Sequence, residues 1–209
     1  MSVSAQEVKE LREKTGAGMM DCKKALVEAD GDQEKAMTVL REKGKAEAKE
    51  KKGRSADEGI IAQYVHGNNK IGVLVELNCE TDFVARNEDF QELGREIAMQ
   101  VAAMDPMVVG REDMPEEVVE REREIYAKHA DDKPDHVVDQ IVDGKMEKFY
   151  AKSCLMEQEY IRDSEKTIQD LVDEMITVVG EKIKVARFER LEVGQGGEQD
   201  EESDQSEAE

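Results

Sequence analysis

The fold is decided at Asn78-Cys79-Glu80-Thr81-Asp82-Phe83-Val84-Ala85-Arg86-Asn87, because the sequence pattern differs on the two sides of this stretch. Before it, residues 71–77 form a β-branched and aliphatic run of strand length. After it, apolar residues recur at helical spacing from Phe90 to Met104. The ten residues are therefore predicted to form a corner between a strand and a helix.

Two interpretations of this corner remain open on its residues alone. Thr81 and Asp82 suit the start of a helix, because their side-chain oxygens accept hydrogen bonds from the open N–H groups of a first turn. In one interpretation Phe83 folds into the core beneath that turn. In the other, Phe83 and the carboxylate of Asp82 are presented together to a partner.

The composition indicates an acidic protein with an aliphatic core. The formal net charge is −21, from 51 acidic and 30 basic residues, and only 4% of the residues are aromatic. An acidic surface repels phosphate backbones, which disfavours direct binding of nucleic acid. It suits a basic protein partner, or solubility in a salt-adapted host.

The sequence predicts a cytoplasmic location. It contains no apolar run long enough to cross a membrane, and its first residues lack the basic and apolar regions of a signal peptide. The three cysteines are far apart, odd in number and without a C-x-x-C pair. This pattern favours a reducing compartment and argues against a zinc site.

Residues 1–44 are predicted to form three short helices. Ser4 and Glu7 form a capping box for the first, Gly31 ends the second, and Asp32 caps a third that we expect to end at Gly44. Such a small bundle suits docking better than catalysis.

Residues 45–57 contain five cationic side chains and no apolar stripe. They form either a solvated helix or a linker, and the composition favours a basic linker. Without interleaved aromatic residues, this segment is a weak candidate for binding nucleic acid.

Residues 58–193 are predicted to form an α+β core, an antiparallel sheet packed with helices. Residues 59–66 and 70–77 are two strands joined by Gly67-Asn68-Asn69, a hairpin pattern. Further helices follow Pro115 and Pro134, the latter interrupted at Gly144, and residues 167–179 form the most amphipathic helix. Residues 182–193 form a strand whose inward phase shifts, which predicts a bulge.

The remaining patterns give no catalytic or cofactor site. Residues 194–209 carry seven acidic and no basic side chains, so we expect an acidic, disordered tail. The three histidines have no metal-ligand spacing, and no glycine-rich phosphate motif or nucleophile set stands out. An enzymatic function is therefore disfavoured, and we expect no metal or cofactor.

Three stretches resemble bacterial elongation factor Ts. They are residues 8–26, which include Thr15-Gly16-Ala17-Gly18-Met19-Met20-Asp21-Cys22, residues 71–85, which include Glu80-Thr81-Asp82-Phe83-Val84-Ala85, and residues 148–158, which begin Lys148-Phe149-Tyr150. The stretches occur in order and at the family's spacing, within a similarity from about residue 3 to residue 193. The chain resembles the short form of the family, with one core unit.

The resemblance implies a guanine-nucleotide exchange factor for the GTPase elongation factor Tu, in translation elongation, and not an enzyme. It implies that the N-terminal helices resemble a ubiquitin-associated domain and dock on the nucleotide-binding domain of the GTPase, with Arg12, Met19 and Met20 at the contact. It also implies that Thr81, Asp82, Phe83 and Val84 enter the GTPase beside its magnesium site. The chain differs from the family pattern in its acidity, in the stretch around residues 131–132 and in its tail.

The sequence leaves two other functions open and favours one assembly state. The three helices and acidic tail also suit a chaperone-like or ubiquitin-type binding module, which would bind many clients and not one GTPase. An acidic metabolic enzyme would require turnover of a small molecule. A homodimer is expected, because one core unit offers half the surface of the longer members and leaves sheet edges or faces uncovered.

Overall fold

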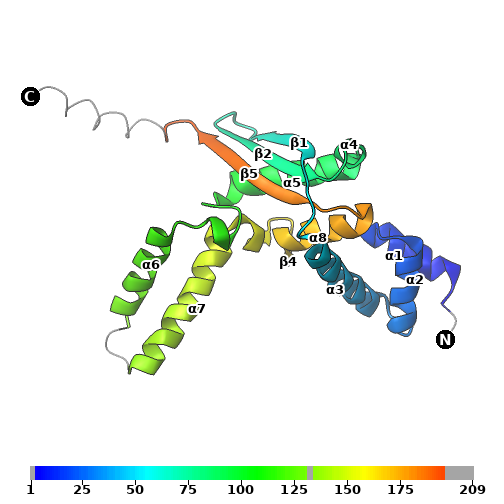
Figure 1. Ribbon diagram of the computed structural model, residues 1–209, viewed down its shortest axis with the longest axis horizontal. Coiled ribbons are helices and arrows are strands. Elements are labelled where there is room, and N and C mark those ends of the chain that lie inside the picture. The colour runs from blue at the N-terminus through cyan, green and yellow to red at the C-terminus, as the bar shows by residue number, and fades with distance from the viewer. Residues whose placement is uncertain (1–2, 131–133, 196–209) are drawn as a thin grey trace, which may run out of the picture.

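The computed structural model describes residues 3–130 and 134–195. Three N-terminal helices lie at one end of the long axis, a three-stranded sheet with its covering helices lies in the middle, and a pair of long helices projects at the other end (Figure 1). This arrangement confirms the predicted α+β class. Most of the predicted tail, from residue 196 onward, and residues 131–133 lie outside the described residues.

The three N-terminal helices are α1 (Ala5–Thr15), α2 (Met19–Glu28) and α3 (Gln33–Lys51). Ser4 and Glu7 form the predicted capping box, and the Asp32 carboxylate accepts from the first N–H groups of α3. Gly16 ends α1 in the left-handed conformation, with φ 68°. The helices share a small core of their own, made of Val8, Leu11, Ala17, Cys22, Ala25, Leu26, Ala29, Ala36 and Leu40.

The third helix is longer than the sequence predicted. It does not end at Gly44 but continues to Lys51, so most of the segment predicted as a linker is helical. Gly44 allows α3 to lie close against α8 (Ile168–Val179), because a Cβ atom there would meet the Thr177 hydroxyl at 2.7 Å. Lys45 also pairs with Asp170 of α8 at 3.2 Å. Tertiary packing thus extends the helix past a residue that usually ends one.

The central sheet has the order β1-β2-β5 and is antiparallel throughout. β1 (Glu58–Val65) and β2 (Ile71–Cys79) form the predicted hairpin, and β5 (Lys184–Glu192) pairs with the other edge of β2. The register shifts opposite Glu76 and Leu77, which confirms the predicted bulge in the last strand.

One face of the sheet carries the main core. Helices α5 (Glu88–Met104) and α8 join the inward residues of β2 and β5 in one buried cluster that includes Val75, Leu77, Phe90, Ile97 and Ile176. The opposite face exposes alternate residues of all three strands, among them Ile61 and Val65 of β1, Leu74 of β2 and Leu191 of β5.

The projecting pair is α6 (Glu116–Lys128) and α7 (Asp135–Ser153). Helix α6 has no buried residue, as its sparse apolar pattern predicted, whereas the interruption predicted at Gly144 is wrong because α7 runs through it. Arg111, in the short helix η1 (Arg111–Asp113), binds Glu147 of α7 and Glu157 of η2 (Leu155–Glu157). Its guanidinium also lies 4.4 Å from the ring centre of Tyr150, so it fastens the base of α7 to the core.

A second small sheet, β3 (Glu159–Tyr160) with β4 (Asp163–Thr167), was not predicted. Its strands are short and polar and carry no strand pattern. They are organised by Gln100, a fully buried side chain of α5 that donates to Gln158 Oε1 at 3.1 Å and accepts from the Ile161 N–H at 3.0 Å.

Candidate functional site

The corner between β2 and α5 contains a separate helical turn, α4 (Asp82–Ala85). Val84 and Ala85 are buried in the main core, which anchors the turn. Phe83 lies between Asp82 and these anchors, yet 80% of its surface is exposed. The core interpretation of Phe83 is therefore wrong, and the corner presents an aromatic ring to the solvent.

The polar residues of the corner differ in what they offer a partner. Thr81 occupies the N-cap position of α4 but makes no capping hydrogen bond, because its hydroxyl donates to Glu181 Oε1 at 2.7 Å. Asp82 is half-exposed and pairs with Arg86 at 2.8 Å. Of the four predicted corner residues, the structure exposes Phe83 and partly Asp82, and buries Val84.

Two carboxylates tie the corner to the rest of the molecule. Glu181 accepts from the backbone N–H groups of Glu80 and Thr81, at 3.1 and 3.0 Å. In return Glu80 accepts from the Lys182 N–H at 2.6 Å and from Arg54 at 3.2 Å. The Lys182 N–H is the main reason that the pKa of Glu80 lies below its usual value. The sequence shows no sign of these contacts, because residues 80–81 and residues 181–182 are about a hundred residues apart.

The two ends of the corner are also fixed. Asn87 caps α5 by accepting from the Asp89 N–H at 2.7 Å, and Gln91 donates to the Ala85 carbonyl at 3.3 Å. Cys79 donates its thiol to the Thr81 carbonyl at 3.2 Å, and burial raises its pKa. This thiol is therefore a structural group and not a nucleophile.

The predicted docking residues of the N-terminal helices lie on the surface. Arg12 on α1 is exposed, as are Met19 and Met20 at the start of α2. Figure 1 shows α4 and the N-terminal helices towards the same end of the long axis, opposite α6 and α7.

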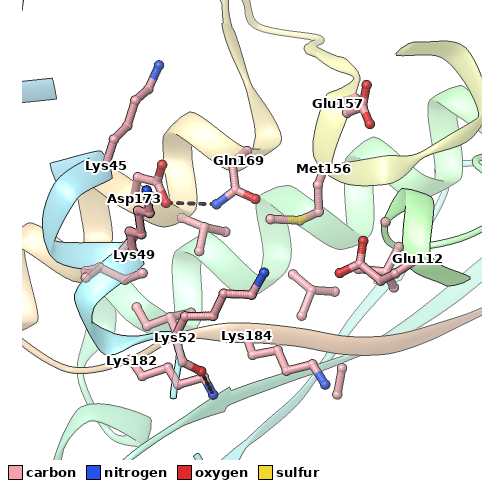
Figure 2. A pocket seen from close by; sticks show the side chains of 18 of the residues that line it. Lys45, Lys49, Lys52, Glu112, Met156, Glu157, Gln169, Asp173, Lys182 and Lys184 are labelled. Carbon is pink, nitrogen blue, oxygen red and sulfur yellow. Dashed lines mark hydrogen bonds between the residues drawn. The ribbon is translucent and has the colours of Figure 1, made fainter. Parts of the chain in front are cut away.

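A pocket of about 740 Å³ lies away from Phe83, between the end of α3, α8, the start of β5 and the two short helices η1 and η2. Figure 2 shows lysines on α3 and β5 around it, with Asp173, Glu112 and Glu157 among its acidic lining. Gln169 donates to Asp173 at 2.8 Å, and the Lys182 ammonium donates to the carbonyls of Lys52 and Arg54. Several of its charged groups are thus already paired within the protein.

Two classes of site are not found in residues 3–130 and 134–195. No group of three or more histidine, cysteine, aspartate or glutamate side chains is arranged to hold a metal ion. No helix in this part of the chain is long and apolar enough to cross a membrane.

Comparison with known proteins identifies the family. The family model for elongation factor Ts matches residues 4–195. The elongation factor Ts of Caldanaerobacter subterraneus is 58% identical over 93% of this chain and 98% of its own length. That of Thermotoga neapolitana is 57% identical over 94% of this chain and its own full length. The chain therefore belongs to the elongation factor Ts family, the non-catalytic cytoplasmic factors that exchange the guanine nucleotide of elongation factor Tu in translation elongation.

Proposed function

We propose that the exchange activity of this protein is carried by Phe83, which enters elongation factor Tu beside its magnesium site when the factor binds the GDP form. The observation that carries the proposal is the exposure of Phe83 directly before two buried anchors, Val84 and Ala85. Because the turn is anchored, the ring keeps its position when it contacts the GTPase. Phe83 can therefore act as a wedge, a rigid side chain that displaces elements of the partner.

The physical argument concerns how a GTPase holds GDP. The phosphates are bound by backbone N–H groups and by a magnesium ion, which is often the largest local charge in such a site. A factor that binds the nucleotide-free GTPase more tightly than the GDP form must weaken GDP binding by the same factor, because the two affinities are linked. Displacing the elements that position magnesium would weaken the binding of GDP in this way.

The other corner residues have supporting roles in this proposal. Asp82 adds negative charge near the diphosphate and competes for hydrogen-bond donors. Val84 anchors the turn from the core, and Thr81 fastens it through Glu181. The N-terminal module, residues 1–44, docks on the nucleotide-binding domain through Arg12, Met19 and Met20.

Replacing Phe83 by alanine tests the wedge. We expect Phe83→Ala to slow release of fluorescent GDP by about 10- to 100-fold, or roughly 1.4–2.7 kcal/mol, a reasonable size for one aromatic hot spot. Asp82→Ala should slow it less, because its half-exposed carboxylate contributes less than a covered ring.

Thermal melts supply the control for this experiment. The melting temperature of Phe83→Ala should stay close to that of the wild type, because the ring is already in water. Met107→Ala, which truncates an exposed apolar side chain elsewhere, should leave both exchange and melting unchanged. A large fall in the melting temperature of Phe83→Ala, with exchange unchanged in the folded fraction, would contradict the wedge.

We also propose that the protein is a homodimer, with the open face of the sheet as the interface. Val65, Gly72 and Leu191 are neighbours in the register, and Leu74 lies two residues from Gly72 on the same face. The three apolar side chains are all exposed. A second copy of the same face would cover them without leaving a sheet face in water.

Light scattering tests the dimer. The wild type should give twice the chain mass of 23.5 kDa at micromolar concentration, whereas Leu74→Glu should give the monomer mass. Ile125→Glu, on the outlying helix α6, is the matched control and should leave the mass unchanged. A wild type that is monomeric at this concentration and fully active in exchange would contradict the dimer.

A further inference from the structure

The corner that carries Phe83 is held by the carboxylate of Glu181, which is about a hundred residues away in the sequence. Gly180 ends α8 in the left-handed conformation, with φ 75°, and the chain then turns so that Glu181 reaches the end of β2. One carboxylate oxygen accepts from the N–H groups of Glu80 and Thr81, and the other from the Thr81 hydroxyl. A single side chain thus binds three donors of the corner.

The attachment is reciprocal and extends to the N-terminal helices. Glu80 accepts from the Lys182 N–H, next to Glu181, and from Arg54 just beyond the end of α3. The Lys182 ammonium also binds the backbone just after α3, because it donates to the Lys52 carbonyl at 2.8 Å. The corner, the start of β5 and the end of α3 are therefore fastened at one point.

Helix α4 needs this support because it has only four residues. A helix of one turn is not stable by itself, and no side chain caps α4 at Thr81. The turn is held from below by Val84 and Ala85, and at its start by Glu181. If the N-terminal end of α4 were not held, Phe83 would become ordered only on binding. The entropy lost in that step would lower the population of the productive complex.

We propose that Glu181 is the positioning residue of the exchange site: it orders the corner before the GTPase arrives, so that Phe83 is presented in its working orientation. This inference rests on the proposed function of Phe83 and adds a residue that acts through its hydrogen bonds to Glu80 and Thr81. It also explains why a carboxylate is placed here, because an ionised acceptor binds N–H and O–H donors more strongly than a neutral one.

The test measures GDP release from fluorescent GDP-loaded elongation factor Tu over a range of factor concentrations. We expect Glu181→Ala to lower the maximal release rate by about tenfold, equivalent to about 1.4 kcal/mol. The half-saturating concentration should stay within about twofold of wild type, because docking through the N-terminal module is untouched. Glu181→Gln, which keeps the shape and one acceptor oxygen, should lie between the two.

Two controls separate positioning from a general loss of structure. Glu174→Ala removes another carboxylate of the same region, paired with Lys166 at 2.8 Å, and should exchange at the wild-type rate. Amide hydrogen exchange should become faster at residues 80–85 in Glu181→Ala, while the amides of α5 stay protected. Unchanged protection at residues 80–85 would overturn the proposal without any use of the GTPase.

A double variant distinguishes failure of this inference from failure of the wedge. If Glu181 acts through Phe83, then adding Glu181→Ala to Phe83→Ala should slow release by less than about twofold more. A further tenfold loss in the double variant would overturn the positioning role and leave the wedge intact. The same conclusion would follow if Glu181→Ala released GDP at the wild-type rate while Phe83→Ala was slow. A wild-type rate for Phe83→Ala would overturn the wedge, and the positioning role would fall with it.

Discussion

At the scale of single residues, Phe83 is a large aromatic side chain that the fold leaves in water. Full burial of a phenylalanine stabilises a fold by about 1.5–3 kcal/mol, and this ring gains little of that while 80% of its surface is in water. Val84 and Ala85 take the buried positions of the turn instead. The favourable burial of the ring is therefore available to a complex.

The sequence named this residue but did not show which way it points. Thr81 and Asp82 indicated the start of a helix correctly, yet neither caps it in the expected way, because Thr81 is bound to Glu181. A distant carboxylate leaves no local pattern in the sequence. Only the tertiary structure, which brings residue 181 beside residue 81, makes the positioning contact visible.

A second residue, Asp173, makes stability depend on pH. Its buried carboxyl has a raised pKa, chiefly because burial disfavours the charged form, and the nearby carboxylate of Asp170 acts in the same direction. Gln169 and Lys45 oppose this, without reversing it. The folded state therefore holds the proton of Asp173 more tightly than the unfolded chain does.

Asp173→Asn tests this consequence. The contribution of Asp173 to stability is fully present below its unfolded pKa of about 3.9 and is lost as the pH rises through the raised folded value. The variant should therefore melt at a higher temperature than wild type at neutral pH, with the difference shrinking towards pH 4. Melts across this range check it, and a variant less stable than wild type at neutral pH would contradict the sign.

At the scale of elements, sequence patterns predicted correctly the strands that bury one face against the core. Two runs rich in β-branched and aliphatic residues, joined by three turn residues, identified β1 and β2, and the phase shift in residues 182–193 indicated the bulge that the register shows. Both errors in the helices came from glycine, which was taken as a helix end at Gly44 and as a break at Gly144. In the first case packing against α8 overrides the local preference, and β3 and β4 likewise depend on a buried glutamine from α5.

These two glycines give a matched test. A Cβ at residue 44 would meet Thr177 and the Asp173 carbonyl at 2.7 and 3.1 Å, whereas nothing lies within 4 Å at residue 144. Gly144→Ala should therefore raise the free energy of unfolding by roughly 0.5–1 kcal/mol, the usual gain in a helix interior. Gly44→Ala should lower it by about 1–3 kcal/mol, because α3 and α8 are forced apart.

Urea unfolding of the two variants beside wild type measures both changes. Equal stabilisation by the two alanines would mean that α3 and α8 do not pack as closely as the structure has them. Since α3 also connects the N-terminal module to the core, slower GDP release by Gly44→Ala, but not by Gly144→Ala, would support the role of that packing in exchange.

At the scale of the whole molecule, the surfaces with proposed roles are separated in space. The corner and the N-terminal helices lie towards one end of the long axis, and α6 and α7 project at the other (Figure 1). The open sheet face is formed by the strands in between. A GTPase and a second copy of the chain would thus occupy different surfaces, so that each protomer of a dimer would exchange nucleotide on its own partner.

The last prediction concerns the acidic tail, which should be dispensable for exchange. Truncation after Val193 removes seven carboxylates and leaves a net charge of −14, which is still ample for solubility. The sheet keeps its last contact, because the Val193 N–H donates to the Lys70 carbonyl at 2.9 Å. The described part of the chain loses two bonds of Gln195, one from Arg190 to its side chain and one from its N–H to the Glu192 carbonyl. At physiological salt, charges more than about 8 Å apart are largely screened, so the tail should have little effect on the corner. GDP release by the truncated factor should therefore stay within about twofold of the full chain at matched salt, since twofold is only about 0.4 kcal/mol. Loss of most of the activity would show that the tail itself contacts the GTPase or orders the factor.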